Sequence, residues 1–214
     1  MECPFCEEFA TGLLPNEYSS LVPSRELHRT ENFAVLADIS PLLVGHLLIT
    51  PIAHKLSFGA MEPELRSELD ELLVETLDIL NESGRRTVIL EHGSAPTHDA
   101  GACIEHAHLQ ILPADIDFDE ALTKYRPRPV GSLWETEKWS SRNCPYLYFQ
   151  NATGEMVVAD RLDGLPKQFI RQVAASALGM HLANLSWDWR LNILGENLVS
   201  TITKYEGRWR KENS

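Results

Sequence analysis

The chain has 214 residues, and its 19 Lys and Arg against 31 Asp and Glu give a net charge of −12. Its composition is that of an ordinary globular domain, long enough to bury a full core. The acidity argues against binding to nucleic acid polymers or anionic membranes, although a few local donors can still hold a small phosphate ligand. The longest apolar runs fall far short of the ~20 residues of a membrane span, and no apolar signal segment follows Met1, so we expect a cytoplasmic protein.

The first half of the chain predicts an antiparallel sheet with one long helix. Glu62 to Glu82 carries apolar residues at helical spacing, with Pro63 suited to the first turn and Gly84 to the exit. The inward stripe of this helix is Leu65, Leu69, Leu72, Thr76 and Ile79. The other expected elements are strands over 32–38, 45–50, 86–91 and 102–112, with a turn at 39–41 and a loop over 92–101.

The second half of the chain differs in composition from the first, and we interpret it as an extension of the core. Residues 115–142 are charged and contain several prolines, which predicts irregular structure. Further on we expect a hairpin of 146–149 with 156–160, a helix over 166–178 with Phe169, Ile170, Val173 and Ala177 inward, a strand over 200–205, and a solvated basic tail over 204–211. The predicted fold is therefore α+β, with a core over residues 1–135 and a C-terminal α/β extension, 136–214, packed on it.

The most informative segment is the predicted strand that contains two of the eight histidines. Because side chains on a strand alternate, His106, His108 and Gln110 would lie on one face and Ala107, Leu109 and Ile111 on the other. The apolar set accounts for burial, whereas the polar set has no packing reason to recur at every second residue. This spacing indicates a shared site.

Two chemistries suit such a site. An imidazole is a competent nucleophile, and attack on phosphorus would give a phospho-histidine, with a neighbouring amide bonding a phosphate oxygen. The preceding loop could bring backbone N–H groups of Gly93, Ser94 and Gly101 to the same phosphate. The alternative is a metal site, since histidine is a common metal ligand. Different histidines can also take different tasks.

A Cys-x-x-Cys pair near the N-terminus bears on the metal alternative. Four cysteines without a signal peptide are not a disulfide framework. Cys3 and Cys6 can give two thiolates to a tetrahedral zinc ion, and two of the histidines, His54 and His106, can complete it. The plain alternative is an incidental pair near the chain end. The isolated Cys103 has the simplest explanation of a small buried hydrophobe.

Two segments resemble the histidine-triad (HIT) superfamily of nucleotide hydrolases and transferases. Residues 37–54, ADISPLLVGHLLITPIAH, are similar to its Asp-Ile-x-Pro and Gly-His stretch, and His106-Ala107-His108-Leu109-Gln110 is similar to its His-x-His-x-His motif. The final Gln is the form found in galactose-1-phosphate uridylyltransferases and diadenosine-polyphosphate phosphorylases. The opening Cys3-Pro4-Phe5-Cys6 also resembles the zinc-binding start of many bacterial members. The resemblance covers residues 1 to 115.

The resemblance implies a HIT-like sheet with a long helix packed on it, a homodimer, and covalent nucleotidyl transfer. His108 would be the nucleophile, Gln110 would bond the phosphate oxygens, and the His106 carbonyl would orient the His108 ring. Asp38 would bind the ribose hydroxyls. The nucleotide-binding set would be Asp38, Ser94, Gly101, Cys103 and Gln110. Zinc, with a structural role and no open position, would be held by Cys3, Cys6, His54 and His106.

The departures from the family pattern leave the reaction open. Gln110 cannot act as a general acid. Either the leaving group departs without protonation, or another residue, such as His92 or His98, donates the proton. Glu91 stands where many members have Asn. We therefore keep hydrolase and transferase as equal alternatives. Two further hypotheses are a zinc-stabilised nucleotide-binding module without turnover, and a hydrolase with a catalytic zinc on His106 and His108.

Overall fold

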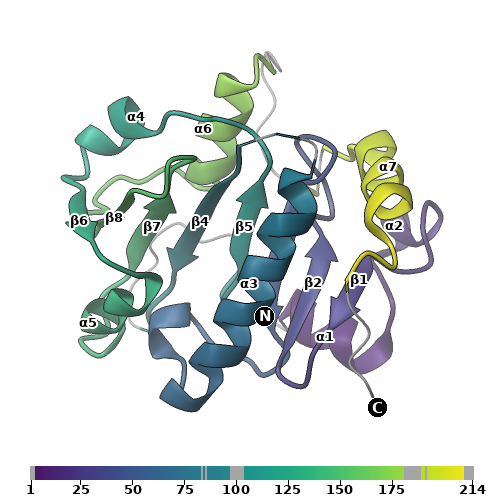
Figure 1. The fold of residues 1–214 in the computed structure, drawn as a ribbon, viewed down its shortest axis with the longest axis horizontal. Coiled ribbons are helices and arrows are strands. Elements are labelled where there is room, and N and C mark those ends of the chain that lie inside the picture. Colours follow the sequence, from purple (N-terminus) through teal and green to yellow (C-terminus); the bar gives the residue numbers. More distant parts are fainter. Residues whose placement is uncertain are drawn as a thin grey trace.

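The computed structural model describes residues 3–82, 84, 86–96, 104–180, 189–190 and 192–209. One eight-stranded sheet forms its centre, with the strand order β1-β2-β3-β5-β4-β7-β8-β6 (Figure 1). Every neighbouring pair is antiparallel, which confirms the predicted α+β class. The strands are β1 (Glu26–Arg29), β2 (Phe33–Ala37), β3 (Leu47–Pro51), β4 (Val88–Gly93), β5 (Leu109–Leu112), β6 (Arg128–Val130), β7 (Tyr146–Gln150) and β8 (Met156–Ala159).

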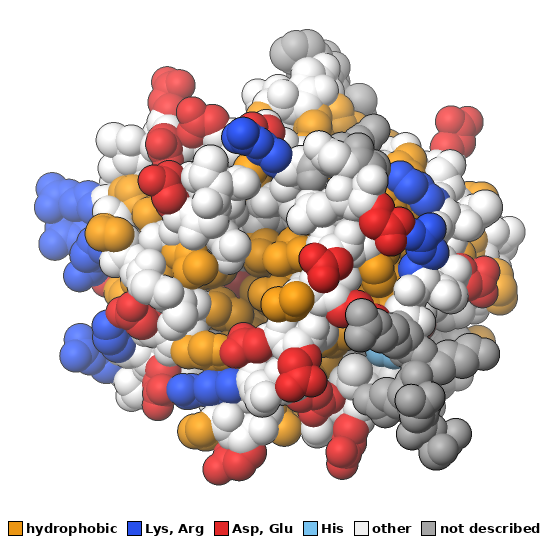
Figure 2. Space-filling view, in the orientation of Figure 1, with side chains coloured by type: hydrophobic (Ala, Val, Ile, Leu, Met, Phe, Trp, Pro, Cys, Tyr) orange, Lys and Arg blue, Asp and Glu red, His pale blue; other side chains and the backbone are white. Residues whose placement is uncertain are grey.

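The long predicted helix lies across one face of the sheet as α3 (Arg66–Asn81), after a short 3-10 turn at Pro63–Leu65 (Figure 1). Its inward stripe is confirmed at Leu69, Leu72, Thr76 and Ile79, which are buried, whereas Leu65 lies in the preceding 3-10 turn and is half-buried. The other helices are α1 (Pro4–Thr11), α2 (Asn16–Ser19), α4 (Asp119–Thr123), α5 (Glu137–Ser140), α6 (Phe169–Ala177) and α7 (Gly195–Tyr205). None of these described helices is long and apolar enough to cross a membrane. Figure 2 shows acidic side chains scattered over the α3 face, as expected from the net charge of −12.

The alternation of side chains gives the sheet two differently covered faces. Leu47, Ile49 and Ile111 pack in the core beneath α3. On the opposite face, Leu48 packs with Phe5 of α1, whereas the more distant strands β4, β5 and β7 pack against α4 and α6. Two separate clusters therefore cover this second face, one under α1 and one under α6. The candidate site lies between them.

The second half of the chain is more regular than the sequence predicted. The hairpin is confirmed, with β7 and β8 paired from Leu147–Ala159 to Gln150–Met156, and β7 extends the sheet at β4. Residues 115–142 are not irregular, because α4, β6 and α5 lie within them. The predicted strand over 200–205 is wrong, since these residues end α7. The division of the chain at residue 135 is not tested by this arrangement and remains a prediction.

Two smaller expectations about the C-terminal region are also corrected. In α6, Phe169 and Ile170 are buried as predicted, but Ala177 is exposed and Ala174 is buried in its place. The basic tail is not simply solvated. Trp209 is only 5% exposed, and its indole N–H donates to the Thr76 hydroxyl of α3 at 3.1 Å. Residues 210–211 of that tail lie outside the described residues.

Glu91 in β4 is a fully buried carboxylate on the α3 face of the sheet. It accepts hydrogen bonds from the Phe58 N–H at 2.6 Å and from the Tyr146 hydroxyl at 2.7 Å. Burial raises the pKa of Glu91 from 4.5 to about 7, against the opposing effect of these two hydrogen bonds. Glu91 therefore belongs to the core beneath α3.

The raised pKa predicts how Glu91→Gln changes stability with pH. A carboxyl whose folded-state pKa is raised stabilises the fold most below its unfolded pKa of 4.5, and this contribution is lost as pH rises through about 7. The free energy of unfolding of the native chain relative to Glu91→Gln should fall by about 3 kcal/mol between pH 4 and pH 8. Denaturant unfolding at several pH values measures this, with the exposed Glu120→Gln as control. A pH-independent difference would contradict it.

Candidate active site

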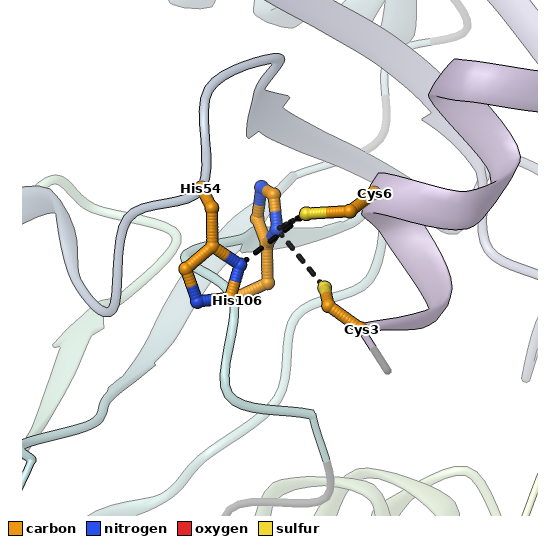
Figure 3. Close-up of side chains that lie close together, drawn as sticks. All are labelled: Cys3, Cys6, His54 and His106. Carbon is orange, nitrogen blue, oxygen red and sulfur yellow. Dashed lines mark hydrogen bonds between the residues drawn. The ribbon is translucent and has the colours of Figure 1, made fainter. Parts of the chain in front are cut away.

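Four metal-ligand residues from three separate segments converge at one edge of the second face (Figure 3). Cys3 and Cys6 lie at the start of α1, His54 follows β3, and His106 precedes β5. Their ligand atoms all lie within 4.8 Å of one another. The structure thus brings together the complete metal set that the sequence predicted.

The donor set fits a tetrahedral zinc ion. Sulfur and nitrogen ligands at ordinary bond lengths to zinc are separated from each other by roughly 3.5 Å. Here Cys3 Sγ lies 3.3 Å from His106 Nδ1, Cys6 Sγ lies 3.3 Å from His54 Nδ1, and Cys6 Sγ lies 3.7 Å from His106 Nδ1. Burial and the neighbouring Cys3 thiol raise the pKa of Cys6 to about 11. A divalent cation would reverse this effect, because it favours thiolates.

A hydrogen bond of His106 Nε2 fixes the ring tautomer that metal binding through Nδ1 requires. Nε2 lies 2.8 Å from the Pro51 carbonyl oxygen, which can only accept, so Nε2 carries the hydrogen and Nδ1 keeps its lone pair. Burial lowers the pKa of His106 to about 4, so the ring is neutral at neutral pH. With two thiols and two imidazoles in the set, all four positions of a tetrahedral ion would be filled by protein. This arrangement disfavours the hypothesis of a catalytic zinc on His106 and His108.

His108 is held by the backbone of His106. Its Nδ1 lies 2.7 Å from the His106 carbonyl oxygen, so Nδ1 carries the hydrogen and Nε2 keeps the lone pair. Burial lowers the pKa of His108, against the opposing effect of this hydrogen bond, so its neutral form prevails at neutral pH. The Phe5 ring of α1 lies beside it, with centroids 5.6 Å apart. His108 therefore has a fixed tautomer with a nucleophilic nitrogen.

A cavity of about 510 Å³ opens at His108 between α1 and α6. The predicted strand over 102–112 is shorter than expected: β5 begins at Leu109, and the two histidines precede it. His106 turns to the metal set, whereas His108 and Gln110 line the cavity. The polar part of the cavity wall consists of Glu7, Glu8, Thr11, Arg25, Asp38, His92, His108, Gln110, Gln168 and Arg171, and its apolar part includes Phe5, Leu14, Ile39, Leu48, Phe169 and Trp189.

Asp38, the predicted ribose ligand, also lines this cavity, at the end of β2. Its Oδ1 accepts hydrogen bonds from the Ser40 N–H at 2.8 Å and from Arg171 Nη1 at 3.0 Å. Burial opposes ionisation, but His46, Arg171, the Ser40 N–H and Arg25 together lower the pKa of Asp38 to about 2. Sequence reasoning missed Arg171, which lies 133 residues away in the chain. It lies in the predicted helix over 166–178, and no motif marks it as part of the site.

The remaining predicted residues are only partly brought to the cavity. Ser94 is buried, and its backbone N–H donates to the Leu56 carbonyl at 3.1 Å instead of facing the cavity wall. Gly101 and Cys103, like the candidate proton donor His98, lie outside the described residues. The other candidate donor, His92, follows Glu91 on β4 and so points to the opposite face, where it lines the cavity.

Comparisons with known proteins find fold neighbours only. No family model matches the chain, and no curated protein matches it. A HIT family protein from Bacillus subtilis has 21% identity and a TM-score of 0.43, covering 53% of this chain and 74% of its own. A HIT family protein from Bacillus anthracis has 20% identity and a TM-score of 0.43, and the match covers 66% of this chain and 89% of that protein. A zinc-bound histidine triad family protein from Mycobacterium smegmatis has 22% identity and a TM-score of 0.41, over 53% and 76%. These values assign no family to the chain.

Proposed function

We propose that this chain catalyses nucleotidyl transfer through a covalent nucleotidyl-histidine on His108, in the manner of the histidine-triad proteins that its motifs resemble. The observation that carries the proposal is the 2.7 Å hydrogen bond between His108 Nδ1 and the His106 carbonyl. It leaves Nε2 with a lone pair at the wall of a cavity large enough for a nucleotide. Asp38 and Gln110, both in that wall, supply acceptors and donors for the ribose and the phosphate.

The reaction would have two displacements at one phosphorus. His108 Nε2 forms a bond to the phosphorus of a nucleoside phosphate as the bond from phosphorus to the leaving-group oxygen breaks, and that oxygen departs with the electron pair. Gln110 donates a hydrogen bond to a non-bridging oxygen but cannot donate a proton. A phosphate or pyrophosphate leaving group needs none, and His92 is the described candidate donor for a more basic one. An oxygen of water, inorganic phosphate or a phosphorylated acceptor then forms a bond to the same phosphorus as the bond to His108 Nε2 breaks, and the electron pair returns to Nε2. Where water attacks, its proton is released to solvent.

Zinc fits the scheme as a structural ion. Cys3, Cys6, His54 and His106 would hold it, and its contribution would be to fix the start of α1 and the segment before β5. Those two segments place Phe5 and His108 against each other. The chain's own groups then carry out the chemistry at phosphorus.

The test is the mass of the intact protein after brief incubation with substrates of three kinds. Dinucleoside polyphosphates, sugar nucleotides and nucleoside phosphoramidates are each mixed with the protein and quenched in alkali, because phosphorus–nitrogen bonds to imidazole break in acid. We expect one nucleotidyl adduct with at least one of the three, absent in His108→Ala and present in the control His28→Ala, whose residue lies outside the cavity. Tight nucleotide binding with neither adduct nor turnover would contradict the proposal and favour the binding module.

A further inference from the structure

The loop that carries Asp38 is fastened by the C-terminal part of the chain. Between β2 and β3, the Pro41 carbonyl accepts from Asn197 Nδ2 at 2.9 Å, and the Gly45 N–H donates to the Thr201 hydroxyl at 3.0 Å, both residues of α7. The Ser40 hydroxyl donates to the Asn192 carbonyl. The position of this loop thus depends on residues that lie some 150 positions later in the sequence.

Among the described residues of the C-terminal part, it is Arg171 of α6 that reaches the Asp38 carboxylate itself. The Arg171 side chain is 7% exposed; its Nη1 donates to Asp38 Oδ1 at 3.0 Å and its Nη2 to the Ser40 carbonyl at 2.7 Å. The planar guanidinium therefore ties the carboxylate to the backbone of its own loop. The Ser40 N–H donates to the same oxygen, so both lone pairs of Asp38 Oδ1 already accept hydrogen bonds.

The second carboxylate oxygen of Asp38 is left for a ligand. Both hydrogen bonds that the Asp38 carboxylate accepts from described residues go to Oδ1, and His46 Nε2 lies 3.9 Å from Oδ2, too far for a hydrogen bond. Asp38 lines the cavity and keeps 11% of its side chain exposed there. Oδ2 thus offers lone pairs to hydroxyl donors inside the cavity, in an orientation that the bonds to Oδ1 fix.

Arg171 is also the cation that compensates this buried carboxylate at neutral pH. His46 is neutral there, because burial lowers its pKa to about 4. The other nearby cation, Arg25, is paired with Glu8 through its Nε at 2.9 Å and its Nη2 at 2.7 Å. Arg171 has no such second carboxylate among the described residues. It therefore supplies both the charge and the geometry.

We propose that Arg171 is a positioning residue, which holds the Asp38 carboxylate so that its free oxygen accepts hydrogen bonds from the vicinal hydroxyls of a ribonucleotide. This inference rests on the proposed function. It assigns to the C-terminal extension a part in selecting ribose over deoxyribose, and not merely in covering the sheet. A charged hydrogen bond from a hydroxyl to a buried carboxylate is strong enough to discriminate between the two sugars.

The test compares the affinities for the four ribonucleoside monophosphates and their 2′-deoxy counterparts, measured by calorimetry on the full chain. We expect the native protein to prefer a ribonucleotide by about tenfold or more. In Arg171→Gln that preference should shrink to within about threefold, as in Asp38→Asn, while deoxynucleotide affinity changes little. Arg171→Lys keeps the positive charge but not the planar pair of guanidinium donors, so its ribose preference should lie between those of the native chain and of Arg171→Gln. The control Arg86→Gln, at an exposed arginine, should leave the preference unchanged.

The outcomes separate the two proposals. If the native chain binds no nucleotide, the proposed function fails, and the role of Arg171 with it. If the native chain binds both sugars equally, or if Arg171→Gln weakens both by the same factor, only the positioning role is overturned. Should Arg171→Gln not fold, Arg171→Lys decides the question, because an unchanged ribose preference in that variant overturns the proposal.

Discussion

Replacing His108 by Ala is expected to lower turnover by at least ~10³-fold while nucleotide affinity stays within a few-fold of the native value. The reason is that the hydrogen bond from His108 Nδ1 to the His106 carbonyl leaves Nε2 of the same ring with a lone pair, and His108 lines the cavity. Binding, by contrast, is spread over Asp38, Gln110 and the apolar wall. Steady-state rates and calorimetric affinities on the same preparation separate the two effects.

A substitution of Gln110, which also lines the cavity, provides the comparison for this prediction. Gln110→Ala should lower turnover by a smaller factor, about 10² to 10³, since an amide that stabilises charge assists the reaction without taking part covalently. A His108→Ala variant that keeps a tenth or more of native turnover would contradict the role of His108 as nucleophile. Equal losses in turnover and in affinity would instead indicate that His108 mainly binds the nucleotide.

Replacing Cys6 by Ser is expected to release the metal ion and lower the melting temperature by about 10 °C. A tightly bound ion stabilises the fold by about 4 kcal/mol or more, and each kcal/mol moves the melting temperature of a chain of this size by about 2–4 °C. The four residues lie in three segments that are far apart in sequence, so the loss of an ion bound by them would weaken the attachment of α1 to the sheet. Metal analysis by mass spectrometry and thermal unfolding, with and without added zinc alone, measure this.

Cys144→Ser is the matched control, because Cys144 lies outside the metal set and its thiol donates only to the Arg142 carbonyl. It should keep about one zinc per chain and the native melting temperature. The prediction fails if the native protein, loaded with zinc and freed of excess, contains none. It also fails if Cys6→Ser unfolds at the native temperature whether or not zinc is present.

Local patterns predicted elements in both halves of the chain. The stripe in α3 follows from the helical period of 3.6 residues, and the hairpin of β7 and β8 follows from two short apolar runs on either side of the turn residues 151–154; the sequence displays both directly. The end of α7 shows where this reasoning fails. Ser200 to Tyr205 is rich in β-branched residues and suggests a strand, but Leu198, Thr201 and Tyr205 form a buried helical stripe once the whole segment is considered. Strand propensity depends on packing partners that a short window does not include.

The candidate site divides in the same way. Cys3, Cys6, His108 and Gln110 stand in motifs whose spacing is visible in the sequence, and the structure brings each to a cluster or cavity with the expected neighbours. Arg171 carries no motif, and its bond to Asp38 exists only because α6 packs beside the end of β2. Such long-range pairs follow from the packing of the sheet's second face, which no local period encodes.

The location of the trapped nucleotidyl group is the sharpest test of His108 as the nucleophile. After incubation with whichever substrate gives the adduct, the protein is cleaved by a protease at alkaline pH and the modified peptide is sequenced by mass spectrometry. We expect a single nucleotidyl group on His108, in the peptide that contains residues 104–112. A modification on His92 or on any other residue, or rapid turnover with no trapped group under conditions that preserve phosphorus–nitrogen bonds, would contradict this expectation.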